Sequence, residues 1–282
     1  MTSLAVRGRR RRSSSTRNIV VLAVCALTIL IPLYIAVVTA LKSPGEIIAG
    51  TGIELPGSLY WQNFADAWTS TNFPRALLNT ATVAAGTVLL VLVATSAFAY
   101  AMARNLHRWE FRVAHVFVLA ALFVPFPIVM LPLVQQTAAW GIDNLFGLIL
   151  LYFVFNLPLN TLLYTSFIRT LPIEIEQAAQ LDGASTGRVF WRIVFPLLAP
   201  MNATVGILMF LHSWNDFLLP LVLLTDPDLR TLPLAQSVFS STTNVSYGPA
   251  FASYLMSVLP VLVVYLISQR WVLSGVMRGA IQ

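Results

Sequence analysis

The chain consists of long uninterrupted runs of apolar residues separated by shorter polar stretches. A helix needs about 20 apolar residues to cross a bilayer, and six runs are long enough: 19–41, 76–103, 113–133, 145–168, 201–224 and 249–269. Backbone groups in lipid have no water to bond, so each run is predicted to be one helix. A transmembrane barrel would instead need segments of about ten residues with alternating polarity. The pattern therefore predicts an all-α polytopic membrane protein with six transmembrane helices.

The cations are distributed unevenly around the six predicted spans. Fourteen of the seventeen Lys and Arg residues fall on one side if successive helices alternate in direction, and the others are Lys42, Arg75 and Arg230. Positive residues collect in cytoplasmic loops. We therefore expect both termini in the cytoplasm and loops 42–75 and 225–248 outside. The net charge of +6 then reflects topology, and we expect no nucleic-acid partner, because the cations lie in short stretches between apolar runs.

The composition and the missing motifs exclude several functional classes. Hydrophobic residues make up 57% of the chain and charged residues 10%, against about 25% charged in an ordinary soluble domain. The sole lysine, Lys42, is not in a Gly-Lys-Ser/Thr phosphate-binding motif, and the three histidines have no metal-site spacing. Asp216 is the only carboxylate within a predicted span, whereas ion-coupled carriers usually hold more intramembrane ionisable groups. We expect no catalytic and no metal-binding residues, and a pathway subunit energised by other proteins.

The chain divides into three predicted parts. Residues 1–18 are expected to form a basic cytoplasmic tail, disordered over 1–17, residues 19–270 a six-helix transmembrane domain, and residues 271–282 a cytoplasmic C-terminal tail. The first 40 residues have the charge pattern of a signal peptide. Their apolar stretch is longer than the usual 7–15 residues, so we expect a retained anchor helix in contact with the lipid bilayer.

The loop over residues 171–196 differs from all the others. Glu174 and Glu176 suit the positive end of a first short helix, and Gly183 can take the left-handed conformation that stops it. A second short helix is predicted to start at Ser185 or Thr186 and to end at Pro196. Its apolar stripe, at helical spacing, consists of Val189, Phe190, Ile193 and Val194. This amphipathic pair of helices is predicted to be a docking element, and the alternative is a hairpin lying on lipid.

The same loop carries a resemblance to a known family. The run Glu176-Gln177-Ala178-Ala179-Gln180-Leu181-Asp182-Gly183-Ala184, followed by Ile193 and Pro196, resembles the EAA loop of binding-protein-dependent ABC importer permeases. More closely, the chain resembles the maltose-type carbohydrate permease family. Further matches are Ser213-Trp214-Asn215-Asp216-Phe217 with Pro220, Thr231-Leu232-Pro233, and Gln269-Arg270-Trp271 with Gly275 and Gly279. The family usually has glutamate at the position of Gln177.

The resemblance implies the architecture and the partners of a type I ABC importer in the cytoplasmic membrane of a bacterium. A second permease subunit would complete the pathway, and two ATPase subunits would bind ATP and Mg, so this chain would need no cofactor. An external solute-binding protein would deliver a carbohydrate to the loop at 225–248. The EAA loop would dock on an ATPase subunit, and the tail with Gly275 and Gly279 would reach between the ATPase subunits.

Several of these sequence features have a second possible interpretation. Trp214, Asn215 and Asp216 are candidate substrate-path residues, or else a polar clamp between helices. A separate structural alternative for Asp216 is a pairing with His212, four residues earlier on the same helix face. Gly275 and Gly279 have the spacing of close helix packing. The prolines of the third run predict a kink that either lines the path or shapes packing. For the whole chain, the alternatives are a stand-alone secondary carrier and a membrane-embedded enzyme.

Overall fold

The computed structural model describes residues 10–240 and 246–279. These residues form helices joined by loops, and they fall into two compact units. Unit 1 comprises Met1–Ser70 and Val238–Val258, and unit 2 comprises Thr71–Ser237 and Leu259–Gln282. The predicted all-α fold class is confirmed.

Unit 1 holds the first predicted span and the loop that follows it. Its elements are α1 (Arg10–Ala40), α2 (Pro44–Ala49), α3 (Gln62–Ser70) and the first part of α15 (Tyr247–Gly279). The buried side-chain amide of Asn63 donates to the carbonyl oxygens of Ala40 and Lys42, at 2.9 and 2.8 Å. A small apolar core joins these elements, consisting of Ala40, Ala67, Phe239, Ala250 and Ala252. Asn63 thus ties α3 to the end of α1.

The loop between α1 and α3 is closed by one carboxylate. Glu46 accepts hydrogen bonds from the backbone N–H of Ser43 and of Gly57, at 2.9 and 2.8 Å. These backbone donors stabilise the charged form and lower the pKa of Glu46 below its usual value. A folded segment therefore connects α1 to α3.

Helix α1 begins earlier than predicted. We expected residues 1–17 to be disordered, but the helix already includes Arg10 to Arg17. Arginine is a good helix former, and extending an existing helix costs far less than starting one, which explains the earlier start. All residues from Asn18 to Tyr34 are exposed, as expected of a span that faces lipid or another subunit.

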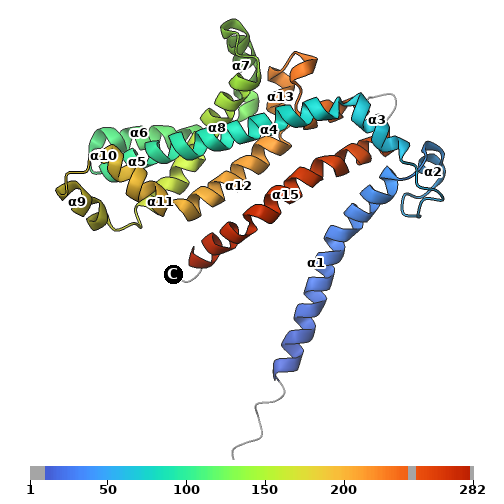
Figure 1. Ribbon diagram of the computed structural model, residues 1–282, viewed down its shortest axis with the longest axis horizontal. Helices are drawn as coiled ribbons and strands as arrows, with labels where there is room; N and C mark the ends of the chain where they lie inside the picture. The colour runs from blue at the N-terminus through green and yellow to red at the C-terminus, as the bar shows by residue number, and fades with distance from the viewer. Residues whose placement is uncertain (1–9, 241–245, 280–282) are drawn as a thin grey trace, which may run out of the picture. The chain divides into compact units, whose positions relative to one another are not determined.

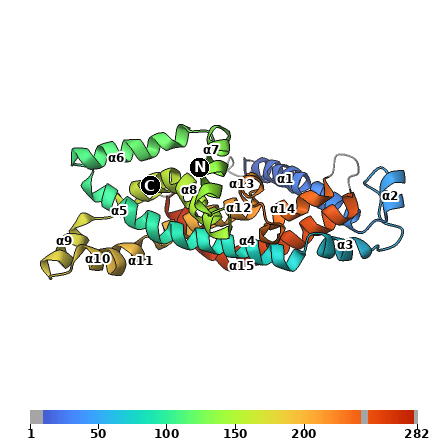
Figure 2. The same ribbon diagram turned by 90° about the horizontal axis from the view of Figure 1, so that it is seen from above.

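Unit 2 is built around one long helical span. This span runs from Phe73 to Asn105 and consists of α4 (Phe73–Leu90), the π-helical turn η1 (Val91–Thr95) and α5 (Ser96–Asn105). Figures 1 and 2 show it as one continuous rod, with α9 and α10 near its α5 end. The other elements are α6 (Trp109–Ala120), η2 (Ala121–Phe123), α7 (Phe126–Trp140), α8 (Leu145–Ile168), α9 (Ile173–Leu181), α10 (Thr186–Val189), η3 (Phe190–Val194), α11 (Phe195–Leu197), α12 (Ala199–Asn215), α13 (Leu218–Leu223), η4 (Pro227–Leu229) and α14 (Leu232–Gln236), with η5 (Ser237–Phe239) where the units meet in sequence.

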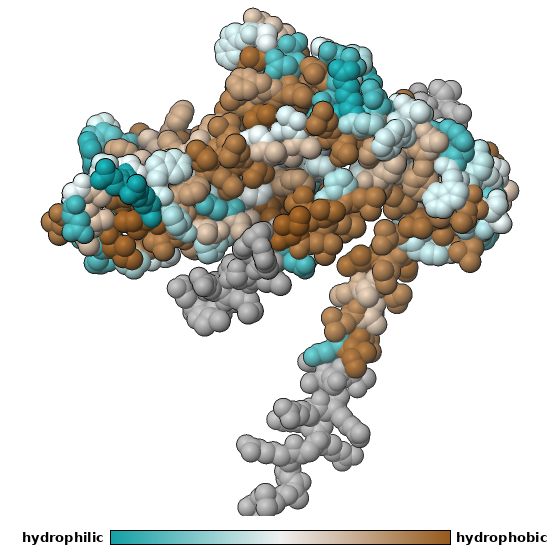
Figure 3. Space-filling model, in the orientation of Figure 1, coloured by the Kyte–Doolittle hydropathy of each residue, from teal (hydrophilic) through white to brown (hydrophobic). Residues whose placement is uncertain are grey.

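The largest core of unit 2 joins the long span to the loop at 171–196. Fully buried side chains of η1, α8 and η3 meet there, for example Val91, Tyr164 and Val194. Helices α8 and α12 pack along the long span. Figure 3 shows hydrophobic surface along the middle of these helices and hydrophilic residues gathered at the end that carries α9 and α10. This distribution is the one expected of helices that cross a bilayer.

The six predicted spans correspond to the upper limit of the number of candidate spans. Four described helices are long and apolar enough to cross a membrane, and the number rises to six if each of two bent pairs counts as one span. The single spans are Asn18–Ala40, Phe73–Asn105, Leu145–Ile168 and Tyr247–Ile267.

The third run does not form the single kinked helix that we predicted. Helix α6 with η2 and helix α7 meet at an angle of 100° (Figure 1). Val124 precedes Pro125 and is extended, with φ −88° and ψ 108°. A residue before proline is pushed out of the helical region, so the chain breaks here instead of bending.

The fifth run is also divided. Helix α12 ends at Asn215, and α13 starts at Leu218 after an extended Asp216. The predicted continuous helix over 201–224 is therefore wrong. The ring of Pro220 would clash with the carbonyl group of Asp216, four residues earlier, if the helix continued through both. Pro220 thus favours the break at Asp216, whereas α8 continues through Pro158.

Candidate functional site

The predicted turn of the loop at 171–196 is present as expected. Helix α9 starts after Pro172, ends at Leu181, and is followed by Gly183 with a φ of +83°. The side chain of Ser185 caps α10 by accepting a hydrogen bond from the backbone N–H of Arg188 at 3.4 Å. The second helix of the loop, Thr186–Leu197, ends one residue after Pro196 and meets α12 at an angle of 75°, so the predicted end is confirmed to within one residue.

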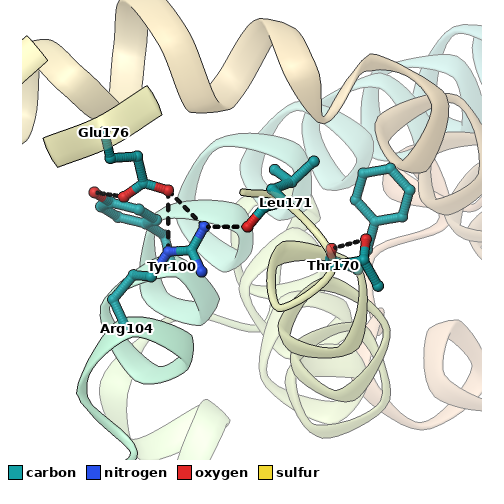
Figure 4. A network of polar contacts seen from close by, with 6 residues as sticks. Tyr100, Arg104, Thr170, Leu171 and Glu176 are labelled. Carbon is teal, nitrogen blue, oxygen red and sulfur yellow. Dashed lines mark hydrogen bonds and ion pairs between the residues drawn. The ribbon is translucent and has the colours of Figure 1, made fainter. Parts of the chain in front are cut away.

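The inner face of α9 is anchored to α5 by a buried ion pair. Glu176 Oε1 accepts from Arg104 Nη2 at 2.6 Å and from Arg104 Nε at 3.0 Å. Its other oxygen accepts from the hydroxyl group of Tyr100 at 2.8 Å (Figure 4). The side chains of Arg104 and Glu176 are only 15% and 6% exposed. Both oxygens of the carboxylate are therefore paired, as burial of a charge requires.

Arg104 and Tyr100 also contact the rest of the loop. Arg104 Nη2 donates to the carbonyl oxygen of Leu171 at 3.3 Å, just before α9 (Figure 4). The ring of Tyr100 lies 5.3 Å from the ring of Phe190, at the start of η3. Two residues of α5, one helical turn apart, thus hold both halves of the loop.

The outer face of α9 has no such partner among the described residues. Gln177, Ala178, Asp182 and Gly183 are exposed, whereas Ala179 and Ala184 pack against the large core of unit 2. Leu181 is 90% exposed, and Ile173 and Ile175 are 43% and 45% exposed. An apolar side chain that is almost fully exposed at the tip of an anchored helix is available for contact with another protein.

A cleft of about 370 Å³ lies between α5, α9 and α10. Its polar lining includes the side chains of Asn105, Gln177 and Gln180 next to the Arg104–Glu176 pair. Ile193 in η3 is half-buried, while Val189 at the end of α10 and Phe190 and Val194 in η3 are buried, so the predicted apolar stripe faces the protein interior.

The candidate path residues do not converge on one surface. Trp214 is 5% exposed, and its ring lies 5.2 Å from the ring of Phe210. Asn215 is exposed, and its amide donates to the carbonyl oxygen of Leu211 at 2.8 Å. Asp216 is half-buried at the break between α12 and α13. Trp214 and Asn215 therefore face different directions on α12, and Asp216 lies at the break that follows them.

The side chain of Asp216 stabilises the non-helical segment between α12 and α13. Its carboxylate accepts from the hydroxyl group of Tyr152 at 2.9 Å and from the backbone N–H of Leu218 and Leu219, at 3.2 and 3.3 Å. The alternative interpretation, a pairing of Asp216 with His212 along one helix face, is not found, because Asp216 lies beyond the helix end. The ring of His212 instead packs edge-on against the ring of Tyr152, with centroids 5.5 Å apart.

The loop after α13 is tied to the start of α4. The amide of Asn79 donates to the carbonyl oxygens of Asp228 and Arg230, at 2.9 and 3.0 Å. The backbone N–H of Leu232 donates to the hydroxyl group of Thr80 at 2.7 Å. These contacts fix η4 and the start of α14 against the long span.

Gly275 and Gly279 lie in the last turns of α15, four residues apart and so on one face. The helix continues through most of the segment predicted as a C-terminal tail, and residues 280–282 lie outside the described residues. Among the described residues, no three His, Cys, Asp or Glu side chains gather so as to hold a metal ion.

Residues 95–278 match the family described as "Binding-protein-dependent transport system inner membrane component". The chain belongs to this family. It is therefore a multi-pass membrane transport subunit of a binding-protein-dependent importer, and not an enzyme. The match begins inside the long span at η1 and includes the whole loop at 171–196.

Relatives of this permease cover nearly the whole chain. The multiple sugar-binding transport system permease protein of Streptococcus mutans is 33% identical over 93% of this chain and 95% of the relative. The diacetylchitobiose uptake system permease protein of Streptomyces coelicolor is 34% identical over 90% of this chain and 84% of the relative. The crystal structure of a bacterial ABC transporter involved in alginate import has the same fold, with a TM-score of 0.78, 22% identity, and coverage of 95% and 99% of the two chains.

The sequence analysis missed three residues of the permease that organise these sites. Tyr100 and Arg104 pair with Glu176, and Tyr152 pairs with Asp216. The one available signal was the spacing of Tyr100 and Arg104, which places a tyrosine and an arginine on one helix face near the end of a span.

Proposed function

We propose that this permease imports a carbohydrate that an external solute-binding protein delivers. The observation that carries the proposal is that relatives named for sugar uptake match at 33% and 34% identity over nine-tenths or more of the chain. Coverage of nine-tenths of the chain supports a pathway built on the same framework as theirs.

The partner set follows from the same proposal. A second permease subunit completes the pathway, and two ATPase subunits bind ATP and Mg and supply the energy. The outer face of α9, with Leu181, Gln177 and Ala178, docks on an ATPase subunit. The buried pairing of Glu176 supports this assignment, because it holds the inner face of α9 to the permease and leaves the outer face free.

The orientation belongs to the proposal too. The Lys and Arg distribution supports cytoplasmic termini, with Arg108 and Arg188 inside and the loops at 42–75 and 225–248 outside. The loop at 225–248 then faces the binding protein, and the end of α15 with Gly275 and Gly279 reaches the ATPase subunits.

The residues from Trp214 to Asp216 are proposed to lie at the substrate path. Asn215 is exposed and offers amide groups to sugar hydroxyls, while Asp216 keeps the helix break open beside it. Trp214 is buried, so its contribution is to shape the wall and not to stack on the sugar.

Transport measurements distinguish this importer from a stand-alone secondary carrier. The tagged permease, purified from its native membrane, should retain an ATPase subunit. Uptake of labelled di- and trisaccharides by cells that express it should stop with vanadate and ATP depletion, and should persist when a protonophore collapses the proton gradient. Uptake that needs the proton gradient, by a chain that purifies alone, would contradict the proposal.

A further inference from the structure

The long span Phe73–Asn105 is hydrogen-bonded to both of the loops that the proposed function assigns to partners. Near its beginning, Asn79 and Thr80 hold the loop that includes Asp228 and Leu232. Near its end, Tyr100 and Arg104 hold α9. The two attachment points are about 30 Å apart at 1.5 Å per residue, which is the thickness of the hydrocarbon core.

We propose that this span is a strut that carries movement between the external loop 225–237 and the cytoplasmic helix α9. The inference rests on the proposed function, which supplies a binding protein at one end and an ATPase at the other. It adds the residues that transmit the movement, Asn79 and Thr80 outside and Tyr100 and Arg104 inside.

The external attachment is specific because it fixes backbone groups. Asn79 gives both amide hydrogens to two carbonyl oxygens, and the buried hydroxyl group of Thr80 accepts from Leu232 N–H and donates to Ala76. The loop cannot move away from α4 without leaving these buried polar groups unpaired. The nearby Arg75–Asp228 ion pair is more than half exposed and adds little.

The cytoplasmic attachment is equally constrained. Separating α9 from α5 would leave the charges of Glu176 and Arg104 buried without partners, which is strongly unfavourable. The Tyr100 ring adds contact with Phe190 beyond the turn. Helix α9 and the end of α5 must therefore move together.

The middle of the strut is packed but locally irregular. The π-helical turn η1 lies between the two attachment points, and Val91 and Thr95 in it are fully buried. Single π-turns inside α-helices occur often at functional sites. Helices α8 and α12 pack against this turn. A displacement of the span at either end is therefore transmitted to α8 and α12.

A fluorescent label on the external loop tests the strut in the assembled complex. The label is attached at Thr225→Cys, which is exposed, with Cys25→Ser removing the free cysteine. ATP with vanadate traps the copurified ATPase after hydrolysis. We expect the label signal to change on trapping in the otherwise unaltered complex, and the change to shrink by about fivefold or more in Thr80→Val and in Glu176→Gln.

Matched controls lie beside each attachment point. Thr82→Val makes the same change at an exposed threonine of α4, and Glu174→Gln at an exposed glutamate of α9; both should keep the full signal. The variant with both Thr80→Val and Glu176→Gln should lose no more signal than either alone, because both act on one strut.

The outcomes separate the strut from the proposed function. Three results would overturn the strut alone. The first is an unreduced signal change in Thr80→Val and Glu176→Gln, and the second is a double variant whose loss of signal is the product of the two single losses. The third is a label whose signal does not change in a complex that traps vanadate. A permease that retains no vanadate-trapping ATPase would overturn the proposed function together with the strut.

Discussion

Replacing Gly183 with valine should uncouple ATP hydrolysis from carbohydrate uptake. Gly183 has a φ of +83° between α9 and Ser185, and no heavy atom within 4 Å would meet an added Cβ. The cost of valine is therefore conformational, about 1–2 kcal/mol. We expect the turn to relieve this cost by rearranging, which would displace Leu181 and Asp182 from the positions in which we propose that they dock. We expect uptake per assembled complex to fall by about 5- to 30-fold, the factor equivalent to 1–2 kcal/mol.

Asparagine at the same position is the control for this effect. Asparagine tolerates the left-handed region far better than a β-branched residue. Gly183→Asn should therefore retain most of the uptake and of the ATPase association, measured on the same purified complex. Equal and normal transport by both variants would show that the turn has no part in docking.

The second large effect is expected at Asp216. Asp216→Leu removes the acceptor for Tyr152 and for the first N–H groups of α13. An unpaired buried hydroxyl group costs about 1–3 kcal/mol and a lost helix cap about 0.5–2 kcal/mol. We expect a loss of about 3 kcal/mol in the stability of unit 2, seen as a lower melting temperature of the purified complex and as weaker assembly.

Two milder variants separate the structural role of Asp216 from a role in the path. Asparagine caps helices as well as aspartate, so Asp216→Asn should assemble and melt normally, and it should lower uptake through the lost charge. Tyr152→Phe removes only the hydroxyl donor and should resemble the parent in both measurements. Normal uptake by Asp216→Asn would show that the charge of Asp216 has no role in the substrate path. If Asp216→Asn melted at a temperature as low as that of Asp216→Leu, the charge would be needed for stability.

The features that the sequence predicted correctly depend on neighbouring residues. The apolar runs predict spans because lipid demands about 20 apolar residues. Gly183 and Ser185 predict the turn in the loop because a left-handed residue and a helix cap are local requirements. The break at Asp216 was missed although Pro220 is local, because the length of the apolar run was given more weight than the proline.

The features that could not be predicted depend on residues far apart in the chain. From the sequence alone, Glu176 is a favourable charge near the start of a helix, and Arg104 is one of the fourteen cations on the predicted cytoplasmic side. Their pairing arises only when α8 brings α9 back to the end of α5, 72 residues away. The attachment of Leu232 to Thr80 spans 152 residues. Periodicity and local propensity contain no information about such pairs.

Photo-crosslinking from α9 tests the central claim most directly. A photoreactive amino acid replaces Leu181, which is 90% exposed, in the tagged full-length permease, and a second variant carries it at the exposed Thr225. After irradiation in the native membrane, mass spectrometry identifies the partner. We predict that position 181 crosslinks to an ABC ATPase subunit and that position 225 does not. Crosslinking of position 181 to lipid alone, or to an external protein, would contradict the account.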